Sequence, residues 1–127
     1  MPRTVSTCVL AVAALLVAVP AAAPSTSGPQ AGAARGCNIR GQQDNLGTTY
    51  VTTLRVSGTT CDNGKKVVRA YHACRHKSGG KGGRCRSRIF GYSCSERRLS
   101  QSRVQYDARA RCKKSGREVF QVYTQNL

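Results

Sequence analysis

Residues 103–112 carry the most regular alternation of apolar and polar positions in the chain. Val104, Tyr106, Ala108, Ala110 and Cys112 alternate with polar, mainly basic residues. Because successive side chains of a strand point to opposite faces, this two-residue period predicts a strand with one buried face and one solvated, mainly basic face. Residues 113–116 (KKSG) form a turn signal, and residues 118–124 (EVFQVYT) are predicted to be the return strand of a hairpin.

Two further elements are predicted ahead of this hairpin. Residues 49–56 are rich in β-branched side chains and predict a strand with Tyr50, Leu54 and Val56 on one face. Thr60 is a suitable N-cap for a helix that ends near His76. Its apolar side is made of Cys61, Gly64, Val67, Val68, Tyr71 and Cys74. Its polar side is made of Lys65, Lys66, Arg69, His72 and His76.

The middle of the chain gives weaker patterns. Residues 78–83 (SGGKGG) predict a mobile loop, and residues 85–94, which contain Ile89, Phe90 and Tyr92, predict a strand. Residues 96–102 are polar and are interpreted as a connection. The order β-α-β-β-β predicts an α+β fold, with one amphipathic helix packed on a mostly antiparallel four-stranded sheet and stabilised by disulfides.

The N-terminal third has the pattern of an exported protein. Residues 1–21 combine an early Arg, eleven apolar residues at 9–19 and a small-residue exit, which is typical of a secretory signal peptide. The alternative, an uncleaved membrane anchor, would need about 20 apolar residues. Residues 22–36 are small and polar and predict a flexible leader, so the folded, cationic domain is expected to span residues 37–127.

Removing the leader leaves six cysteines, and an even number in a small exported chain predicts a disulfide framework. A metal site would favour close C-x-x-C pairs, and the closest cysteines here are nine residues apart, so no metal or other cofactor is expected. Cys61 and Cys74 should lie near opposite helix ends, roughly 20 Å apart. A following strand that runs back along the helix would then favour the pairs Cys74–Cys85, Cys61–Cys94 and Cys37–Cys112, among fifteen possible connectivities.

Charge is the strongest functional signal, because the chain has 21 Lys and Arg against 5 Asp and Glu, a formal net charge of +16. Such a potential attracts anionic polymers and membrane or cell-wall surfaces, although it can also serve solubility alone. The side chains predicted to contact an anionic partner are Lys65, Lys66, Arg69, Arg75, Lys77, Lys81, Arg84, Arg86, Arg88, Arg103, Arg109 and Arg111. The aromatic residues are assigned mainly to core faces, so no specific nucleic-acid readout is expected.

Other activities have weaker sequence support. His72 and His76 stand at i and i+4, a spacing that can share a metal, but two solvated surface histidines are the expected arrangement. A ribonuclease could use His72, Glu96, Glu118 and Arg111, yet no motif brings them together. Residues 77–84 could form a protease-inhibitor loop, but their glycines oppose preorganisation. We therefore expect a secreted, extracellular and monomeric protein that is not an enzyme and adsorbs to anionic polymers or surfaces, with a membrane-disrupting factor as a further alternative.

Four short segments resemble a pattern of small exported proteins of actinobacteria. They are VSGTTC at 56–61, VVRAY at 67–71, GYSC at 91–94 and ARCKKSGREVFQV at 110–122. In that pattern a strand leads to a helix that starts with cysteine, followed by Gly-aromatic-x-Cys and a final Cys-turn-strand hairpin. Cys37, Cys74 and Cys85 are additional to it. The resemblance implies a fold and an exported location, and it implies no activity.

Overall fold

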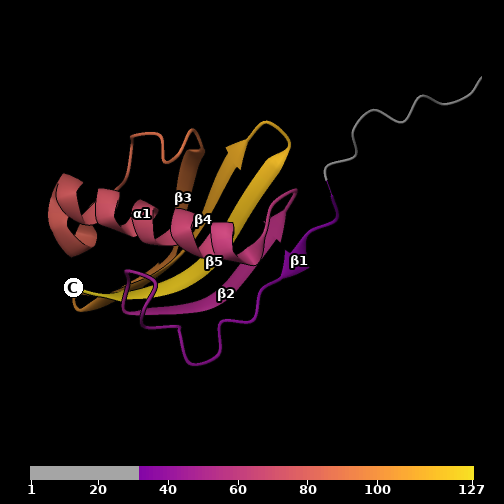
Figure 1. Cartoon of the computed structure of the whole chain (residues 1–127). Coiled ribbons are helices and arrows are strands. Elements are labelled where there is room, and N and C mark those ends of the chain that lie inside the picture. Colours follow the sequence, from indigo (N-terminus) through magenta and orange to yellow (C-terminus); the bar gives the residue numbers. More distant parts are fainter. Residues whose placement is uncertain (1–31) are drawn as a thin grey trace, which may run out of the picture.

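A computed structural model describes residues 32–127, and the predicted signal peptide and most of the predicted leader lie outside this range. The described chain is an α+β domain in which one helix lies across a five-stranded antiparallel sheet (Figure 1). The elements in chain order are β1 (Arg35–Gly36), β2 (Tyr50–Ser57), α1 (Cys61–Gly79), the short 3-10 helix η1 (Gly80–Gly82), β3 (Ser93–Gln101), β4 (Gln105–Lys114) and β5 (Arg117–Asn126).

The strand order in the sheet is β1-β2-β5-β4-β3. The α+β class is confirmed, but the sheet has five strands where four are expected. The additional strand is β1, which pairs Arg35 with Val56 and Gly36 with Arg55 on the edge of β2. The sheet therefore begins two residues ahead of the predicted domain boundary at Cys37.

Helix α1 begins where the sequence predicts it and packs closely on the sheet. The Thr60 side chain accepts a hydrogen bond from the Asn63 backbone N–H at 3.1 Å, which satisfies one free donor of the first turn. A Cβ at Gly64 would lie 2.6 Å from Val56 Cγ1, so a glycine is needed where α1 approaches β2. The helix ends at Gly79, and Gly80 follows with a positive φ of 64°.

The buried side of α1 differs from the predicted one at two positions. His72 and Arg75 are expected on the surface, yet both are fully buried. They continue the helical face made of Gly64, Val67, Val68 and Tyr71, at the three- and four-residue steps that keep a helix face in contact with a sheet. The sequence pattern did not reveal their burial, because it counts only apolar residues as buried and both side chains are polar.

The strand predicted at residues 85–94 is wrong over most of its length, because residues 85–92 form an irregular connection with one isolated bridge between Ile89 and Tyr92. The strand β3 instead occupies most of the segment interpreted as a connection. Its inward positions are Cys94, Glu96 and Arg98, which alternate with more exposed neighbours. This alternation has no apolar signal, so the sequence does not reveal it.

The predicted mobile loop at 78–83 is the end of α1 followed by η1, and side chains from three elements hold it. Arg75 donates to the carbonyls of Lys81 at 3.1 Å and Gly83 at 3.3 Å. Arg98 donates to the Gly82 carbonyl at 2.6 Å, and the Tyr106 hydroxyl donates to Lys81 at 2.8 Å. These bonds satisfy carbonyls that lie beyond the regular helix, so the glycine-rich segment is anchored to the sheet.

Three disulfides are present among the described residues, and they confirm the predicted framework but only one predicted pair. Cys74–Cys85 is confirmed, whereas Cys61–Cys94 and Cys37–Cys112 are wrong. The observed pairs are Cys37–Cys61 and Cys94–Cys112. Cys94 and Cys112 are direct partners in the β3–β4 ladder, with Cα atoms 4.0 Å apart, and Cys37 lies beside β2 through a bond from its N–H to the Leu54 carbonyl.

The prediction failed because it placed the strand expected at residues 85–94 along α1, with Cys94 near the Cys61 end of the helix. The strand β3 lies at the opposite edge of the sheet from β1, so Cys94 meets β4 instead. Three disulfides indicate an oxidising environment. Within residues 32–127, no helix has the length and apolar character needed to cross a bilayer.

The core lies between α1 and the sheet and includes Leu46, Val51, Leu54, Val67, Val68, Tyr71, Tyr106, Ala108, Ala110, Val119 and Tyr123. Three expected core residues are exposed. Tyr50 lies ahead of a register shift between Val51 and Thr53 in β2, Val104 lies in the turn before β4, and Phe90 lies in the turn beside Gly91. In each case an irregularity of the backbone moves the side chain out of the predicted face.

Candidate functional site

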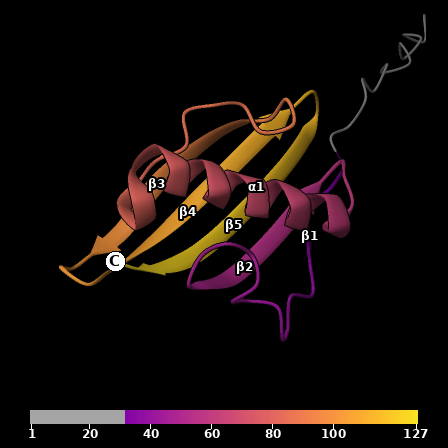
Figure 2. The ribbon, with the colours of Figure 1, turned by 60° about the vertical axis from the view of Figure 1, so that its left-hand side comes forward.

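The sheet has one face covered by α1 and one face with no helix over it among the described residues (Figure 2). We call this second surface the open face. Its position follows from the two-residue period of the strands: Val119, Gln121 and Tyr123 of β5 point toward α1, so their neighbours point away. The outward residues of its central part are Thr53, Arg55, Phe120, Val122, Arg109, Arg111, Lys113, Ser95 and Arg97.

A row of four strand partners crosses the centre of the open face. Phe120 of β5 is paired with Arg55 of β2 on one side and with Arg111 of β4 on the other, and Arg111 is paired with Ser95 of β3. The Arg111 guanidinium carbon lies 5.4 Å from the centre of the Phe120 ring, within the range of a cation–π contact. A half-buried aromatic ring therefore lies between two exposed arginines.

The next row contains Val122, Arg109 and Arg97, which are partners in the same ladders. Arg97 and Arg109 are exposed, and neither has a carboxylate partner within residues 32–127. Neighbouring strands lie about 4.8 Å apart, so the arginines from β2 to β3 extend over roughly 14 Å. The open face thus presents free positive charge over an extended area.

Two shallow hollows flank Phe120 on this face. One has a volume of about 370 Å³ and is lined by Ser95, Glu96, Arg97, Arg109, Arg111 and Phe120. The other, of about 210 Å³, is lined by Ala34, Arg55, Ser57, Arg111, Glu118 and Phe120. The Glu96 side chain is only 4% exposed and its carboxylate bonds to residues on the inner side of the sheet, so the larger hollow remains basic.

The carboxylates of the open face lie toward its margins. Glu118 lies 3.5 Å from Arg111 and 3.8 Å from Lys113. Asp107 accepts hydrogen bonds from Thr124 at 2.6 Å and Ser100 at 2.7 Å, and these bonds hold the pKa of Asp107 below its usual range. Two carboxylates against five Arg and Lys side chains leave the open face with an excess of three positive charges.

Comparison of this chain with protein-family models, curated proteins and solved structures finds no match.

The predicted anion-binding residues do not lie on one surface. Only Arg109 and Arg111 are on the open face, and Arg103 lies in the β3–β4 turn. Lys65, Lys66, Arg69 and Lys77 lie on α1, while Lys81, Arg84, Arg86 and Arg88 lie in η1 and the connection to β3. Arg75 is buried and cannot contact a partner at the surface. Cations therefore occupy two sides of the domain, so net charge alone does not define the site.

The structure adds Arg55, Arg97, Lys113 and Phe120 to the candidate site. The assignment of the aromatic residues mainly to core faces is wrong for Phe120. A signal for its true position was available in the turn: the pair Lys114–Arg117 encloses two residues, Ser115 and Gly116, as in a tight hairpin. Counting back three pairs from that turn places Phe120 opposite Arg111, on the basic face of the alternating strand.

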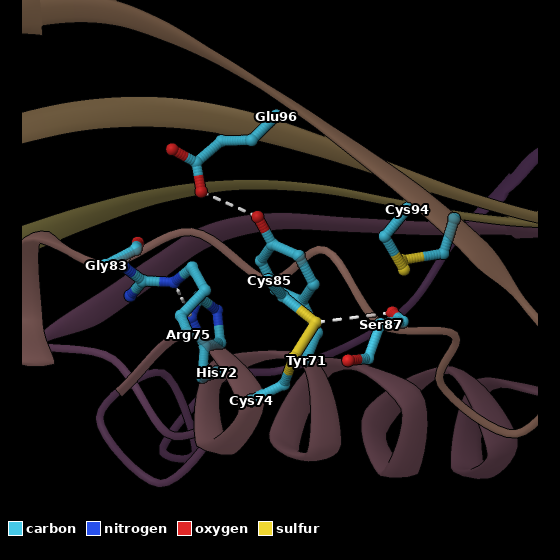
Figure 3. Close-up of a disulfide and its surroundings, with 10 residues drawn as sticks. Tyr71, His72, Cys74, Arg75, Gly83, Cys85, Ser87, Cys94 and Glu96 are labelled. Atoms are coloured by element: carbon cyan, nitrogen blue, oxygen red, sulfur yellow. Dashed lines mark hydrogen bonds between the residues drawn. A yellow bond between two sulfur atoms is a disulfide. The ribbon is translucent and has the colours of Figure 1, made fainter. Parts of the chain in front are cut away.

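A second polar cluster lies between α1 and the inner side of the sheet (Figure 3). The buried Arg75 donates to His72 Nδ1 at 3.1 Å, to Gln125 Oε1 at 3.0 Å and to the Tyr106 hydroxyl. Because His72 Nδ1 accepts from Arg75, its Nε2 carries the proton that bonds to Gln121 Oε1 at 2.9 Å. Every buried side-chain nitrogen and oxygen in the described part of the chain has a hydrogen-bond partner.

Glu96 belongs to the same cluster and is visible above Tyr71 in Figure 3. Its carboxylate accepts hydrogen bonds from the hydroxyls of Tyr71 at 2.6 Å and Tyr123 at 2.7 Å, and Arg98 lies 3.3 Å away. Burial alone disfavours the charged form, but these bonds hold the pKa of Glu96 below its usual value. Burial and the bond to Glu96 raise the pKa of both tyrosines, which stay protonated as donors.

These positions separate the residues considered for a ribonuclease. His72 and Glu96 lie in the buried cluster, whereas Glu118 and Arg111 lie on the open face. His72 also points inward to Gln121, so the predicted pair of solvated histidines is wrong for His72, while His76 is exposed. Within residues 32–127 no group of three or more His, Cys, Asp or Glu is placed to hold a metal ion.

The buried His72 predicts a specific dependence of stability on pH. Burial, followed by the nearby charge of Arg75, lowers the pKa of His72 to about 3. The unfolded chain binds a proton at His72 below about pH 6.5 and the folded chain does not, so stability is full above that pH and falls as pH decreases toward 3. The expected loss is about 1.4 kcal/mol per pH unit, or about 2 kcal/mol between pH 6.5 and 5.

Urea unfolding at pH 7, 6 and 5 measures this dependence. His72→Gln should flatten it, because a glutamine can accept from Arg75 and donate to Gln121 without titrating. His76→Gln is the matched control and should keep the slope, since His76 is exposed. These measurements stay at pH 5 and above, because the ionised Glu96 also stabilises the fold and that contribution is lost as the carboxylate protonates in more acidic solution. An unchanged slope in His72→Gln would contradict the assignment.

Proposed function

We propose that this protein is a secreted, non-enzymatic protein that binds anionic polymers through the open face. The observation that carries the proposal is the group of exposed arginines arranged around Phe120 on the uncovered side of the sheet. Cations without carboxylate partners keep their full attraction for a polyanion, and binding releases the counterions of that polymer. An extended, shallow surface suits a chain-like partner better than a small molecule, which would favour a deeper pocket.

Export is supported by the signal-peptide pattern of residues 1–21, by the resemblance to small exported proteins of actinobacteria, and by three disulfides, which persist in oxidising surroundings. Polymers of suitable charge outside a cell include wall polyphosphates, acidic polysaccharides and free nucleic acid. A monomer is favoured, because two open faces in contact would oppose each other with an excess of three positive charges each.

The experiment measures the affinity of the leaderless, disulfide-bonded domain for long-chain polyphosphate. The double variant Arg97→Gln/Arg109→Gln removes two exposed charges that have no ion pair in the described structure, so the fold should be unaffected. If each lost contact removes about 0.7 released counterion, affinity should fall roughly 25-fold at 0.1 M salt.

The control is Lys66→Gln/Lys77→Gln, which removes two exposed charges from α1. Its affinity should stay within about threefold of the parent, because those side chains lie on the other side of the molecule and act only through screened, long-range attraction. Equal losses in the two variants would remove the assignment to the open face. Absence of binding by the parent domain at low salt would remove the proposed function itself.

A further inference from the structure

Resting on the proposed function, we propose that the polymer selected by the open face is single-stranded nucleic acid, with a base stacked on Phe120 and the flanking phosphates held by arginines. The starting observation is the position of the ring. A basic surface can bind polyphosphate or a sulfated polysaccharide by charge alone, and neither polymer requires an aromatic side chain. Yet an aromatic ring lies half-exposed in the middle strand of the basic surface, next to Val122.

Single-stranded nucleic acid combines the two chemistries that this surface offers. Each nucleotide carries one negative phosphate and one planar π system, and open antiparallel sheets that display aromatic side chains are a recurrent platform for unpaired bases. Stacking on an aromatic side chain tolerates any base, because every base has a π face. The assignment of the aromatic residues mainly to core faces, which argued against nucleic acid, does not hold for Phe120.

The surroundings of Phe120 provide room for the base and donors for the backbone. The hollows of about 370 Å³ and 210 Å³ on its two sides give access to the ring from the surface. Arg97 and Arg109 line the larger hollow, Arg55 lines the smaller one, and Arg111 borders both. A single-stranded nucleic acid that crosses the sheet can thus place one base at Phe120 while its phosphates reach guanidinium groups on either side.

The same geometry disfavours duplex nucleic acid. Bases of a duplex are stacked on each other and can be reached only through the grooves, whereas Phe120 is half-buried and lines a shallow hollow. A duplex would contact the arginines through its phosphates and leave the ring unused. Single strands should therefore bind more tightly than a duplex of the same sequence.

The test uses fluorescence, because the chain contains no tryptophan. Phe120→Trp creates the only indole, at the site of the proposed stacking. The probes are a thymidine 12-mer, an abasic deoxyribose-phosphate 12-mer of the same charge, the duplex of the thymidine 12-mer with its complement, and heparin. Quenching of Trp fluorescence by the thymidine 12-mer, and not by the abasic 12-mer or heparin, is the expected result.

Affinity measurements give a second readout. Phe120→Leu keeps an apolar side chain but removes the ring, and it should weaken binding of the thymidine 12-mer about tenfold. Binding of the abasic 12-mer should change less than twofold. Val122→Ala is the matched control, since it removes apolar surface from the neighbouring position of the same face, and it should leave the ratio between the two probes unchanged.

Several outcomes would overturn the inference. Equal weakening of both 12-mers by Phe120→Leu would assign the ring to structure, and tighter binding of heparin than of the thymidine 12-mer would assign the surface to acidic polysaccharides. Equal quenching by thymidine and abasic 12-mers would exclude stacking even if Phe120→Leu were unstable. In all these cases the proposed function survives if Arg97→Gln/Arg109→Gln still weakens binding of polyphosphate more than Lys66→Gln/Lys77→Gln does. It fails when no polyanion binds the parent domain.

Discussion

Replacing Arg75 by methionine is expected to lower the free energy of unfolding by about 3–5 kcal/mol, the largest effect of any single substitution considered for this domain. The guanidinium is fully buried and donates to five acceptors: His72, Lys81, Gly83, Tyr106 and Gln125. Methionine fills similar space but has no donors, so several buried acceptors lose their partner at once. Each buried acceptor without a partner costs about 1–3 kcal/mol.

The gain from removing a buried charge offsets part of this loss. Arg75 contributes to the low pKa of Glu96, so its removal also leaves that carboxylate with less compensation. Urea unfolding at pH 7 measures the change. Arg69→Met is the matched control. Arg69 is exposed, and within residues 32–127 its side chain makes one hydrogen bond, to the Asn45 carbonyl, so its loss should cost less than about 1 kcal/mol. Equal stability of Arg75→Met and the parent protein would contradict the role assigned to Arg75.

Removal of the Cys37–Cys61 bridge is expected to have the second largest effect. In the chain-entropy description, a bridge stabilises more when it closes a longer loop of the unfolded chain. Cys37 and Cys61 are 24 residues apart, compared with 18 for Cys94–Cys112 and 11 for Cys74–Cys85. The double variant Cys37→Ser/Cys61→Ser should lose about 3–4 kcal/mol, and Cys74→Ser/Cys85→Ser about 0.6 kcal/mol less.

Non-reducing peptide mapping followed by urea unfolding of the serine variants tests this ranking and the connectivity together. A peptide that links Cys61 to Cys94 would contradict the structure directly. A larger loss from the Cys74–Cys85 pair than from the Cys37–Cys61 pair would instead show that the entropic description does not govern these bridges.

Patterns of apolar residues predicted the elements that bury apolar side chains. The hairpin of β4 and β5 and the start of α1 were located to within about two residues, because each alternates or repeats apolar positions in a single way. The strand β3 was missed because its inward side chains are a half-cystine, a carboxylate and a guanidinium. Those groups are buried through specific partners in other elements, and such partners cannot be seen in a local pattern.

The candidate site was predictable only where apolar and polar residues alternate in a single way. The alternation in β4 correctly placed Arg109 and Arg111 on a solvated face. In β5, however, Phe120 and Val122 alternate with Val119 and Tyr123, so both faces carry apolar residues and the pattern does not choose between them. The register of the hairpin and the packing of α1 on one side of the sheet decide that Val119 and Tyr123 are buried and that Phe120 and Val122 face outward.

The polar contacts beneath α1 have a consequence for the surface on the other side of the sheet. An apolar helix could slide by one turn, about 5.4 Å, and repack against the same strands. Here such a displacement would separate Arg75 from Gln125 and Tyr71 from Glu96 simultaneously, because these bonds are directional and join single pairs of atoms. The helix therefore has one permitted position over the inner face of the sheet. The register of β4 and β5 sends their arginines to the opposite face, so the arrangement of these charges exists before any ligand arrives.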